Sequence, residues 1–214
     1  MFSSVAENDI MLGYLSLMFG LVFVQNFVLS QFLGLCPFLG VSKKQSIALG
    51  MGLAVVFVMV MSCIATFFFY FLVLVPLEAG EYLDIASFIL IIAALTQLVE
   101  LVIKKHSPSL YEALGIYLPL LSTNCAVLGA TQLKIAEFGQ KVASGSLSFW
   151  DAFAQNTIIG IFGGLGFTLA IFLMASLRER LDTAPVPDSL KGTPLAFIVT
   201  ACMALAFFGF AGII

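Results

Sequence analysis

The sequence predicts an all-α, polytopic membrane protein with six transmembrane helices. Of its 214 residues, 61% are hydrophobic and only 10% are charged, whereas a typical soluble domain is about half apolar and a quarter charged. So few charges could not cover the surface of a soluble domain. The composition therefore excludes a soluble catalytic or nucleotide-binding domain. The net charge of −3 also offers no basic surface for nucleic acid.

Uncharged runs divide the chain into its expected helices. A helix needs about 20 apolar residues to cross the hydrocarbon core of a membrane. The runs cover residues 10–42, 45–77, 85–99, 113–133, 152–177 and 192–214. The third run is short, but an apolar helix can continue past Glu100 to Ile103. We therefore expect the whole chain, residues 1–214, to form a single membrane domain.

The basic residues predict how the helices are oriented. Loops that are rich in lysine and arginine stay in the cytoplasm. The loops after the first, third and fifth runs hold seven of the nine basic residues, which are Lys43, Lys44, Lys104, Lys105, Arg178, Arg180 and Lys191. Only Lys134 and Lys141 lie on the other side. Both termini are therefore expected on the outer side of the membrane.

The two halves of the chain share short motifs in the same order. The pattern C-x-x-L-G begins at Cys36 and again at Cys125, and the second and fifth runs share a G-x-G pattern. The copies would cover about residues 10–105 and 110–214. Three spans in each copy make the second copy inverted relative to the first. Inverted repeats are found in many transport proteins, whose sites lie where the copies meet.

The first and fourth helices are expected to be broken. Glycine and proline cluster in both, at Gly34, Pro37, Gly40, Gly115, Pro119 and Gly129. Such residues interrupt a helix and free backbone amides inside the membrane. The ends of half-helices can face an anionic ligand or cofactor. Two ordinary kinked helices are the alternative interpretation.

Two of the four cysteines stand out by position. Cys36 and Cys125 occupy equivalent places in the two copies, whereas Cys63 and Cys202 do not and are expected to act as small apolar residues. Two thiolates are too few for an iron–sulfur cluster, which normally takes four. The others would come from Cys63 and Cys202, a second copy or a related partner. Structural zinc and inert thiols are the alternatives.

Six short motifs along the chain are distinctive: NFVLS at 26–30, LCPFLGVSKK at 35–44, ALGIYLPL at 113–120, TNCAVLG at 123–129, LRERL at 177–181 and GFAG at 209–212. Together they resemble the RnfA family, the A subunits of the Rnf electron-transport complex. The E subunit of the sodium-pumping NADH:quinone oxidoreductase is a close relative of this family. The resemblance covers nearly the whole chain.

The resemblance implies a function in electron transport. Rnf complexes couple electron transfer between ferredoxin and NAD to the pumping of sodium ions or protons across the prokaryotic inner membrane. The chain would pair with a homologous E-type subunit in opposite orientation and join the B, C, D and G subunits. Each of the pair would contribute two cysteines to one intramembrane [2Fe-2S] cluster. Cys36 and Cys125 match these positions, and Cys63 and Cys202 match none.

The resemblance also limits what this chain does by itself. It would be part of an ion-translocating oxidoreductase, a translocase, with no complete active site of its own. Flavin attachment in the family uses a Ser-Gly-Ala-Thr type motif, and residues 128–131 read LGAT and lack the serine. We therefore expect no bound flavin in this chain.

Four other residues are candidates for supporting roles. Pro37 fits a helix breaker beside Cys36, and Asn124 fits a polar neighbour of Cys125 that tunes the cluster or holds the break. Asn26 lies inside the first run and is expected to bridge helices. Glu100 interrupts an apolar run, which is typical of ion pathways. It could equally form an ordinary i,i+4 pair with Lys104.

Two other functions fit parts of the sequence. A secondary transporter would explain the inverted repeat, but it should carry polar residues in several spans, and beyond Glu100 the chain has few charges there. A scaffold that anchors peripheral subunits would have incidental cysteines and no metal centre.

Overall fold

A computed structural model describes most of the chain. The described residues are 13–42, 44–76, 80–106, 121, 123–133, 135–143, 145, 148–183, 185, 187 and 190–212. Every regular element within these ranges is a helix, so the all-α fold is confirmed for them. The first part of the fourth predicted run, residues 113–120, lies outside the described residues.

The helices follow one another through the described ranges as short and long segments. In order they are Gly13–Val24, which ends in the π-helical turn η1 (Gly20–Val24), α2 (Leu35–Val41), α3 (Gln45–Phe69) with its π-helical end η2 (Tyr70–Leu74), α4 (Gly80–His106), α7 (Cys125–Gln132), α8 (Ile135–Ala143), α9 (Phe149–Leu181) and α10 (Thr193–Phe208) with the 3₁₀ turn η4 (Gly209–Gly212).

Three helices are long and apolar enough to cross a membrane. They span Gln45–Leu74, Leu83–Val102 and Phe149–Leu181, with 30, 20 and 33 residues. Two shorter apolar helices, Gly13–Val24 and Thr193–Phe208, accompany them. The structure therefore has the helices of a membrane protein. The count of six spans and the inverted repeat remain predictions.

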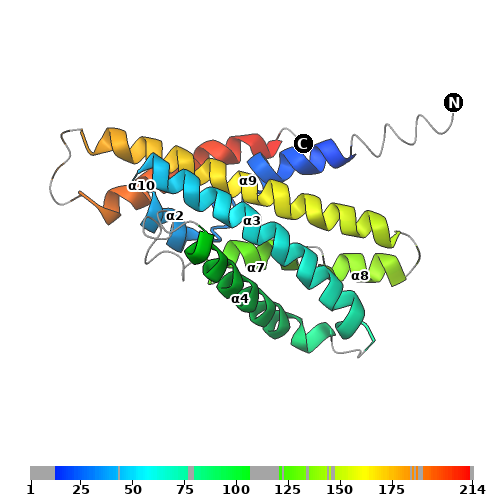
Figure 1. Ribbon diagram of the computed structural model, residues 1–214. Coiled ribbons are helices and arrows are strands. Elements are labelled where there is room, and N and C mark those ends of the chain that lie inside the picture. Colours follow the sequence, from blue (N-terminus) through cyan, green and yellow to red (C-terminus); the bar gives the residue numbers. More distant parts are fainter. Residues whose placement is uncertain are drawn as a thin grey trace.

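The centre of the fold is the pair α3 and α9, which run antiparallel to each other (Figure 1). A Cβ atom built on Gly160 would lie 3.2 Å from the Cα of Val60, and one built on Gly164 would lie 2.8 Å from the Cα of Val56. Four residues further along α9, from Gly160 to Gly164, the contact moves four residues back along α3, from Val60 to Val56, because the two helices are antiparallel. Small residues at this spacing let two helix backbones approach closely, so the G-x-x-x-G face of α9 fixes the register of the pair.

Four of the described basic residues lie at one end of the molecule. The start of α3 meets the end of α9, where the Gln45 N–H donates to Glu179 Oε1 at 3.0 Å and Gln45 Nε2 donates to Ser176 Oγ at 3.3 Å. The start of α10 lies at this same end, and α8 lies at the other (Figure 1). Lys44, Arg178, Arg180 and Lys191 thus gather at one end, away from Lys141 in α8.

Candidate functional site

The first predicted run contains a break between two helical pieces. The helix Gly13–Val24 ends in a π-helical turn that closes with a 2.7 Å hydrogen bond from the Gln25 N–H to the Gly20 carbonyl oxygen. The chain then runs without a regular helix until α2 begins at Leu35. The break therefore lies upstream of Cys36 and Pro37.

Asn26 holds the start of this break. Its side chain is fully buried, and Nδ2 donates to the carbonyl oxygens of Val22, at 3.0 Å, and of Gly166 in α9, at 2.8 Å. Its Oδ1 accepts from the backbone N–H groups of Val28 and Leu29, at 3.0 and 3.3 Å. The amide thus uses both donor hydrogens and both acceptor positions. The prediction that Asn26 bridges helices is confirmed.

The segment before Cys36 makes a sharp turn into α2. Gly34 caps the helix with a φ of +79°, a left-handed conformation that glycine adopts without steric cost. Cys36 is the second residue of α2 and is exposed, and Pro37 follows as a buried third residue. The first turn of a helix tolerates proline because its N–H would have no helical partner there. Pro37 therefore belongs to the start of α2.

The second cysteine also stands at the start of a helix. Cys125 is the first residue of α7 and is exposed. Asn124 is the N-cap, and its Oδ1 accepts from the Ala126 N–H at 3.0 Å. Asparagine is among the preferred N-cap residues because its side chain satisfies a free amide of the first turn. The local sequence thus explains why α7 begins at this cysteine.

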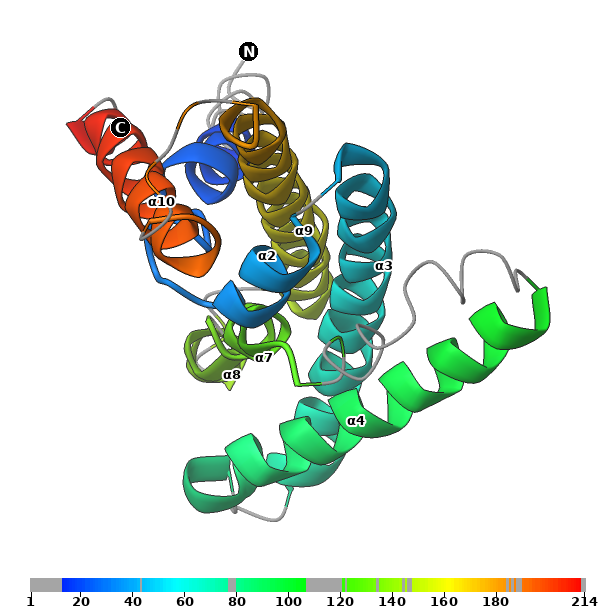
Figure 2. The same ribbon diagram turned by 90° about the vertical axis from the view of Figure 1, so that its left-hand side faces the viewer.

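The caps of α2 and α7 are in contact. A Cβ atom built on Gly34 would lie 2.7 Å from Asn124 Oδ1 and 3.1 Å from the Cβ of Ala126. One built on Gly129 would lie 2.6 Å from Leu33 Cδ1. The two short helices accordingly lie side by side (Figure 2). The fold therefore brings the starts of the two cysteine-bearing helices together.

The other two cysteines lie elsewhere. Cys63 is fully buried in α3, where its carbonyl oxygen accepts from Asn156 Nδ2 at 2.7 Å. Cys202 is exposed on α10. All four cysteines are free thiols. Among the residues that the structure describes, no three histidine, cysteine or acidic side chains form a metal-binding group.

A cavity of about 280 Å³ opens beside Cys125. It lies between α4 and the start of α7 and is lined by Ile89, Ile92, Ala93, Thr123, Asn124, Cys125 and Leu128. Apart from residues 123–125, its walls are apolar. The cavity places one of the two candidate thiols in a largely apolar space.

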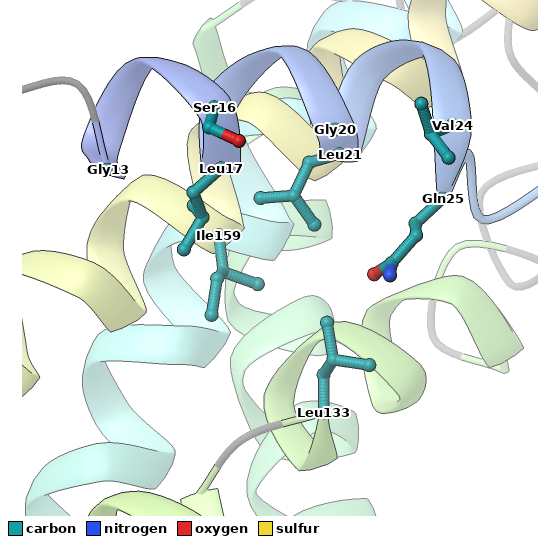
Figure 3. Close-up of a pocket in the computed structure, with 9 residues that line it drawn as sticks. All are labelled: Gly13, Ser16, Leu17, Gly20, Leu21, Val24, Gln25, Leu133 and Ile159. Carbon is teal, nitrogen blue, oxygen red and sulfur yellow. The ribbon is translucent and has the colours of Figure 1, made fainter. Parts of the chain in front are cut away.

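A second cavity of about 360 Å³ lies under the first helix (Figure 3). Gln25 and Ser16 are its polar side chains, and Leu17, Leu21, Leu133 and Ile159 complete most of the wall. Neither Cys36 nor Cys125 lines it. This space is therefore separate from the cavity beside Cys125.

Three charged residues, Glu100, Lys104 and Arg178, lie outside the walls of both cavities. Glu100 is partly buried in α4, and Lys104 is exposed one turn later, so both interpretations of Glu100 remain predictions. Sequence reasoning missed a role for Arg178, which donates to the Leu39 carbonyl oxygen at 2.8 Å and to Ser42 Oγ at 3.0 Å. The only available signal was a basic residue at the end of an apolar run.

Comparison with known proteins assigns the family. A family model described as "Rnf-Nqr subunit, membrane protein" matches residues 14–214. The chain belongs to the Rnf-Nqr family. Both cysteine-bearing helix starts and the α3–α9 pair lie inside the matched range.

Similar members of the Rnf-Nqr family are named as A subunits. The chain is 50% identical over 197 residues to the A subunit of the Na(+)-translocating ferredoxin:NAD(+) oxidoreductase complex of Acetobacterium woodii, and the match covers 92% of this chain and 95% of that protein. It is 48% identical to the A subunit of the ion-translocating oxidoreductase complex of Syntrophotalea carbinolica, over 95% of this chain and 99% of the relative. The protein of the same name from Vibrio vulnificus is 46% identical over 95% of this chain and 100% of the relative.

Proposed function

We propose that this chain is the electron-carrying A-type membrane subunit of an ion-translocating ferredoxin:NAD oxidoreductase complex. In this proposal Cys36 and Cys125 supply two of the four ligands of an intramembrane [2Fe-2S] cluster. A homologous E-type subunit in opposite orientation supplies the other two. The names of the similar A subunits support the complex. The observation that carries the site is that two exposed thiols begin two helices whose caps touch.

The chemistry of the residues present fits such a cluster. Both thiols are free and exposed, as ligands that meet a second subunit must be. Helix N-termini favour negative charge, and Cys125 opens α7. The described residues offer no third ligand nearby, so a shared site is needed. Asn124 adds a buried amide nitrogen without a partner among the described residues.

The residues of this chain would position the thiols and exclude water. When bound, a [2Fe-2S] cluster accepts and releases one electron inside a hydrocarbon core about 30 Å thick. Asn26 ties the turn before α2 to α9, and Arg178 ties the end of α2 to the same helix. Asn124 caps α7 directly before Cys125. Apolar side chains such as Ile89 and Ile92 line the cavity beside that thiol and would keep it dry.

The proposal includes the membrane topology. We infer six spans in two inverted copies, with both termini on the periplasmic side of a prokaryotic inner membrane. Support comes from the gathering of Lys44, Arg178, Arg180 and Lys191 at one end of the molecule, because loops rich in basic residues stay cytoplasmic. The B, C, D and G subunits would complete the assembly.

A scaffold or transporter without a metal centre is the rival function. The test is to purify the assembled complex with Cys36→Ala or Cys125→Ala and to measure iron together with the electron paramagnetic resonance spectrum. We expect either substitution to remove one [2Fe-2S] signal while the other subunits remain. Cys202→Ala is the matched control, because Cys202 is also exposed but lies on α10.

Unchanged iron and spectrum in an intact Cys36→Ala complex would leave the scaffold function in place. Loss of the [2Fe-2S] signal in the Cys202→Ala complex would instead favour a cluster whose four cysteine ligands all come from this chain. The proposed ion path is tested separately with Glu100→Gln, which should slow ion transport without changing the iron content. Unchanged transport would leave Glu100 a structural residue.

A further inference from the structure

The two ends of the Asn124 side-chain amide have different surroundings. Its Oδ1 accepts a 3.0 Å hydrogen bond from the Ala126 N–H. Because a backbone N–H needs an acceptor, this contact decides which end of the amide is oxygen. The other end, Nδ2, is buried and has no hydrogen-bond partner within the described chain, and the residue is only 3% exposed.

Asn124 differs in this respect from the other buried asparagines among the described residues. Asn26 Nδ2 donates to two carbonyl oxygens, and Asn156 Nδ2 donates to the Cys63 carbonyl oxygen. Unpartnered buried atoms also occur on Ser62 and Gln132, but neither residue lines the cavity beside Cys125. Burying an amide N–H₂ group without an acceptor costs folding free energy. A bound group that accepts this hydrogen bond would remove the cost.

The cavity that Asn124 shares with Cys125 contains few groups that could accept this hydrogen bond. Its other walls are apolar apart from Thr123. Asn124, whose Nδ2 has no partner within the described chain, and the candidate ligand Cys125 thus line the same cavity. In such surroundings of low polarity a hydrogen bond to a negatively charged acceptor is strong. A thiolate or sulfide sulfur that carries negative charge is the acceptor with the required chemistry.

We infer that Asn124 Nδ2 donates a hydrogen bond to sulfur at the Cys125 ligand position and thereby raises the reduction potential of the bound centre. This inference rests on the proposed function. Reduction adds negative charge, and a fixed donor stabilises the more negative form more strongly. Hydrogen bonds to sulfur are among the factors that set the potentials of iron–sulfur clusters. Asn124 is thus a positioning residue with two tasks, a helix cap through Oδ1 and a donor through Nδ2.

The experiment separates these two tasks by redox titration of the cluster signal in the purified complex. Asn124→Ser keeps a good N-cap acceptor and removes the N–H₂ donor, and Asn124→Asp keeps the shape and replaces the donor with oxygen. Both should retain iron and assembly but shift the midpoint potential downward. We expect a fall of about tenfold in the equilibrium constant for reduction, about 59 mV for one electron. Asn156→Ser, which removes the buried hydrogen bond to the Cys63 carbonyl oxygen near the start of α9, should leave the potential unchanged.

A measurement on the unaltered complex makes the test independent of variant folding. Asparagine labelled with ¹⁵N in its side-chain amide should give a ¹⁵N coupling to the reduced cluster in pulsed electron paramagnetic resonance. That coupling should disappear in Asn124→Ser. An unchanged potential with iron intact, an absent coupling, or an equal shift in Asn156→Ser would each overturn the inference and leave the proposed function standing. A wild-type complex without this cluster would overturn both.

Discussion

The guanidinium of Arg178 donates a 2.8 Å hydrogen bond to the carbonyl oxygen of Leu39, 139 positions earlier in the chain. Leu39 lies near the end of α2, and Arg178 lies in the last turn of α9. A second bond, to Ser42 Oγ, reaches the residue that ends α2. A cation at the end of a helix also meets the negative end of its dipole. The short helix that carries Cys36 is therefore anchored at its far end by α9.

Removing this anchor should destabilise the protein. Arg178→Ala would leave the Leu39 carbonyl oxygen without its partner, at a cost of about 1–3 kcal/mol. Thermal unfolding of the purified chain in detergent would measure the loss. Arg180→Ala, two positions along on an exposed part of α9, should stay within about 0.5 kcal/mol of the wild type. Equal losses for the two variants would contradict the anchoring role.

Replacing the Asn26 amide with a carboxyl group should be more damaging. Asn26→Asp would remove both donors to the Val22 and Gly166 carbonyl oxygens and place oxygen against oxygen in a buried site. We expect a loss of at least about 2 kcal/mol in the same unfolding experiment. Gln140→Glu makes the same chemical change at an exposed position of α8 and should have little effect. A stable Asn26→Asp variant would show that the break needs no such support.

Adding one methyl group to the α3–α9 contact should also reduce stability. In Gly164→Ala the new Cβ would lie 2.8 Å from the Cα of Val56, and backbone cannot move aside as a flexible side chain can. Overpacking of this kind costs about 1–3 kcal/mol. Gly209→Ala is the control, because nothing lies within 4 Å of its Cβ position. If both variants unfold at the wild-type temperature, the backbones of α3 and α9 do not approach each other as closely as this contact requires.

The four thiols should differ in their reaction with N-ethylmaleimide. In the isolated chain in detergent, Cys36, Cys125 and Cys202 are exposed and should be modified, whereas the buried Cys63 should be protected. Peptide mass spectrometry identifies each modified site, and denatured protein provides the fully modified reference. In the assembled complex Cys36 and Cys125 should become protected. Continued modification of either there would argue against a shared ligand set.

The proposed orientation can be tested in intact cells with a maleimide that cannot cross membranes. In a chain whose own cysteines are replaced by alanine, Gln140→Cys should react, because α8 is placed outside. Thr183→Cys, just after α9, should react only after the cells are lysed. Both positions are exposed, so the reverse pattern would invert the topology.

The sequence predicts the nature of the helices better than their contacts. Its low charge content and long apolar runs identify α3, α4 and α9, because burial in lipid requires that composition along a whole helix. The spacing of Gly160 and Gly164 also indicates the face of α9 that packs closely against another helix. The hydrogen bonds of Asn26 to Gly166 and of Arg178 to Leu39 join positions 140 and 139 residues apart, and no local pattern encodes such partners.

The candidate site is likewise predictable only in outline. The repeated C-x-x-L-G pattern indicates Cys36 and Cys125, and Asn124 is a recognisable helix cap. The contact between Gly34 and Asn124 depends on how two half-helices cross, which no motif specifies. From the sequence, proline predicts that the helix breaks at Pro37. The structure has the break upstream of Pro37, where the buried Asn26 side chain makes four hydrogen bonds that stabilise the non-helical backbone.

Cys36 and Cys125 face outward from the fold that carries them, and this has a consequence for biogenesis under the proposed function. A polypeptide that owns only half of a coordination sphere cannot retain the metal by itself. Insertion into the bilayer and pairing with the second polypeptide must then precede the delivery of iron and sulfide, so maturation follows a fixed sequence of events.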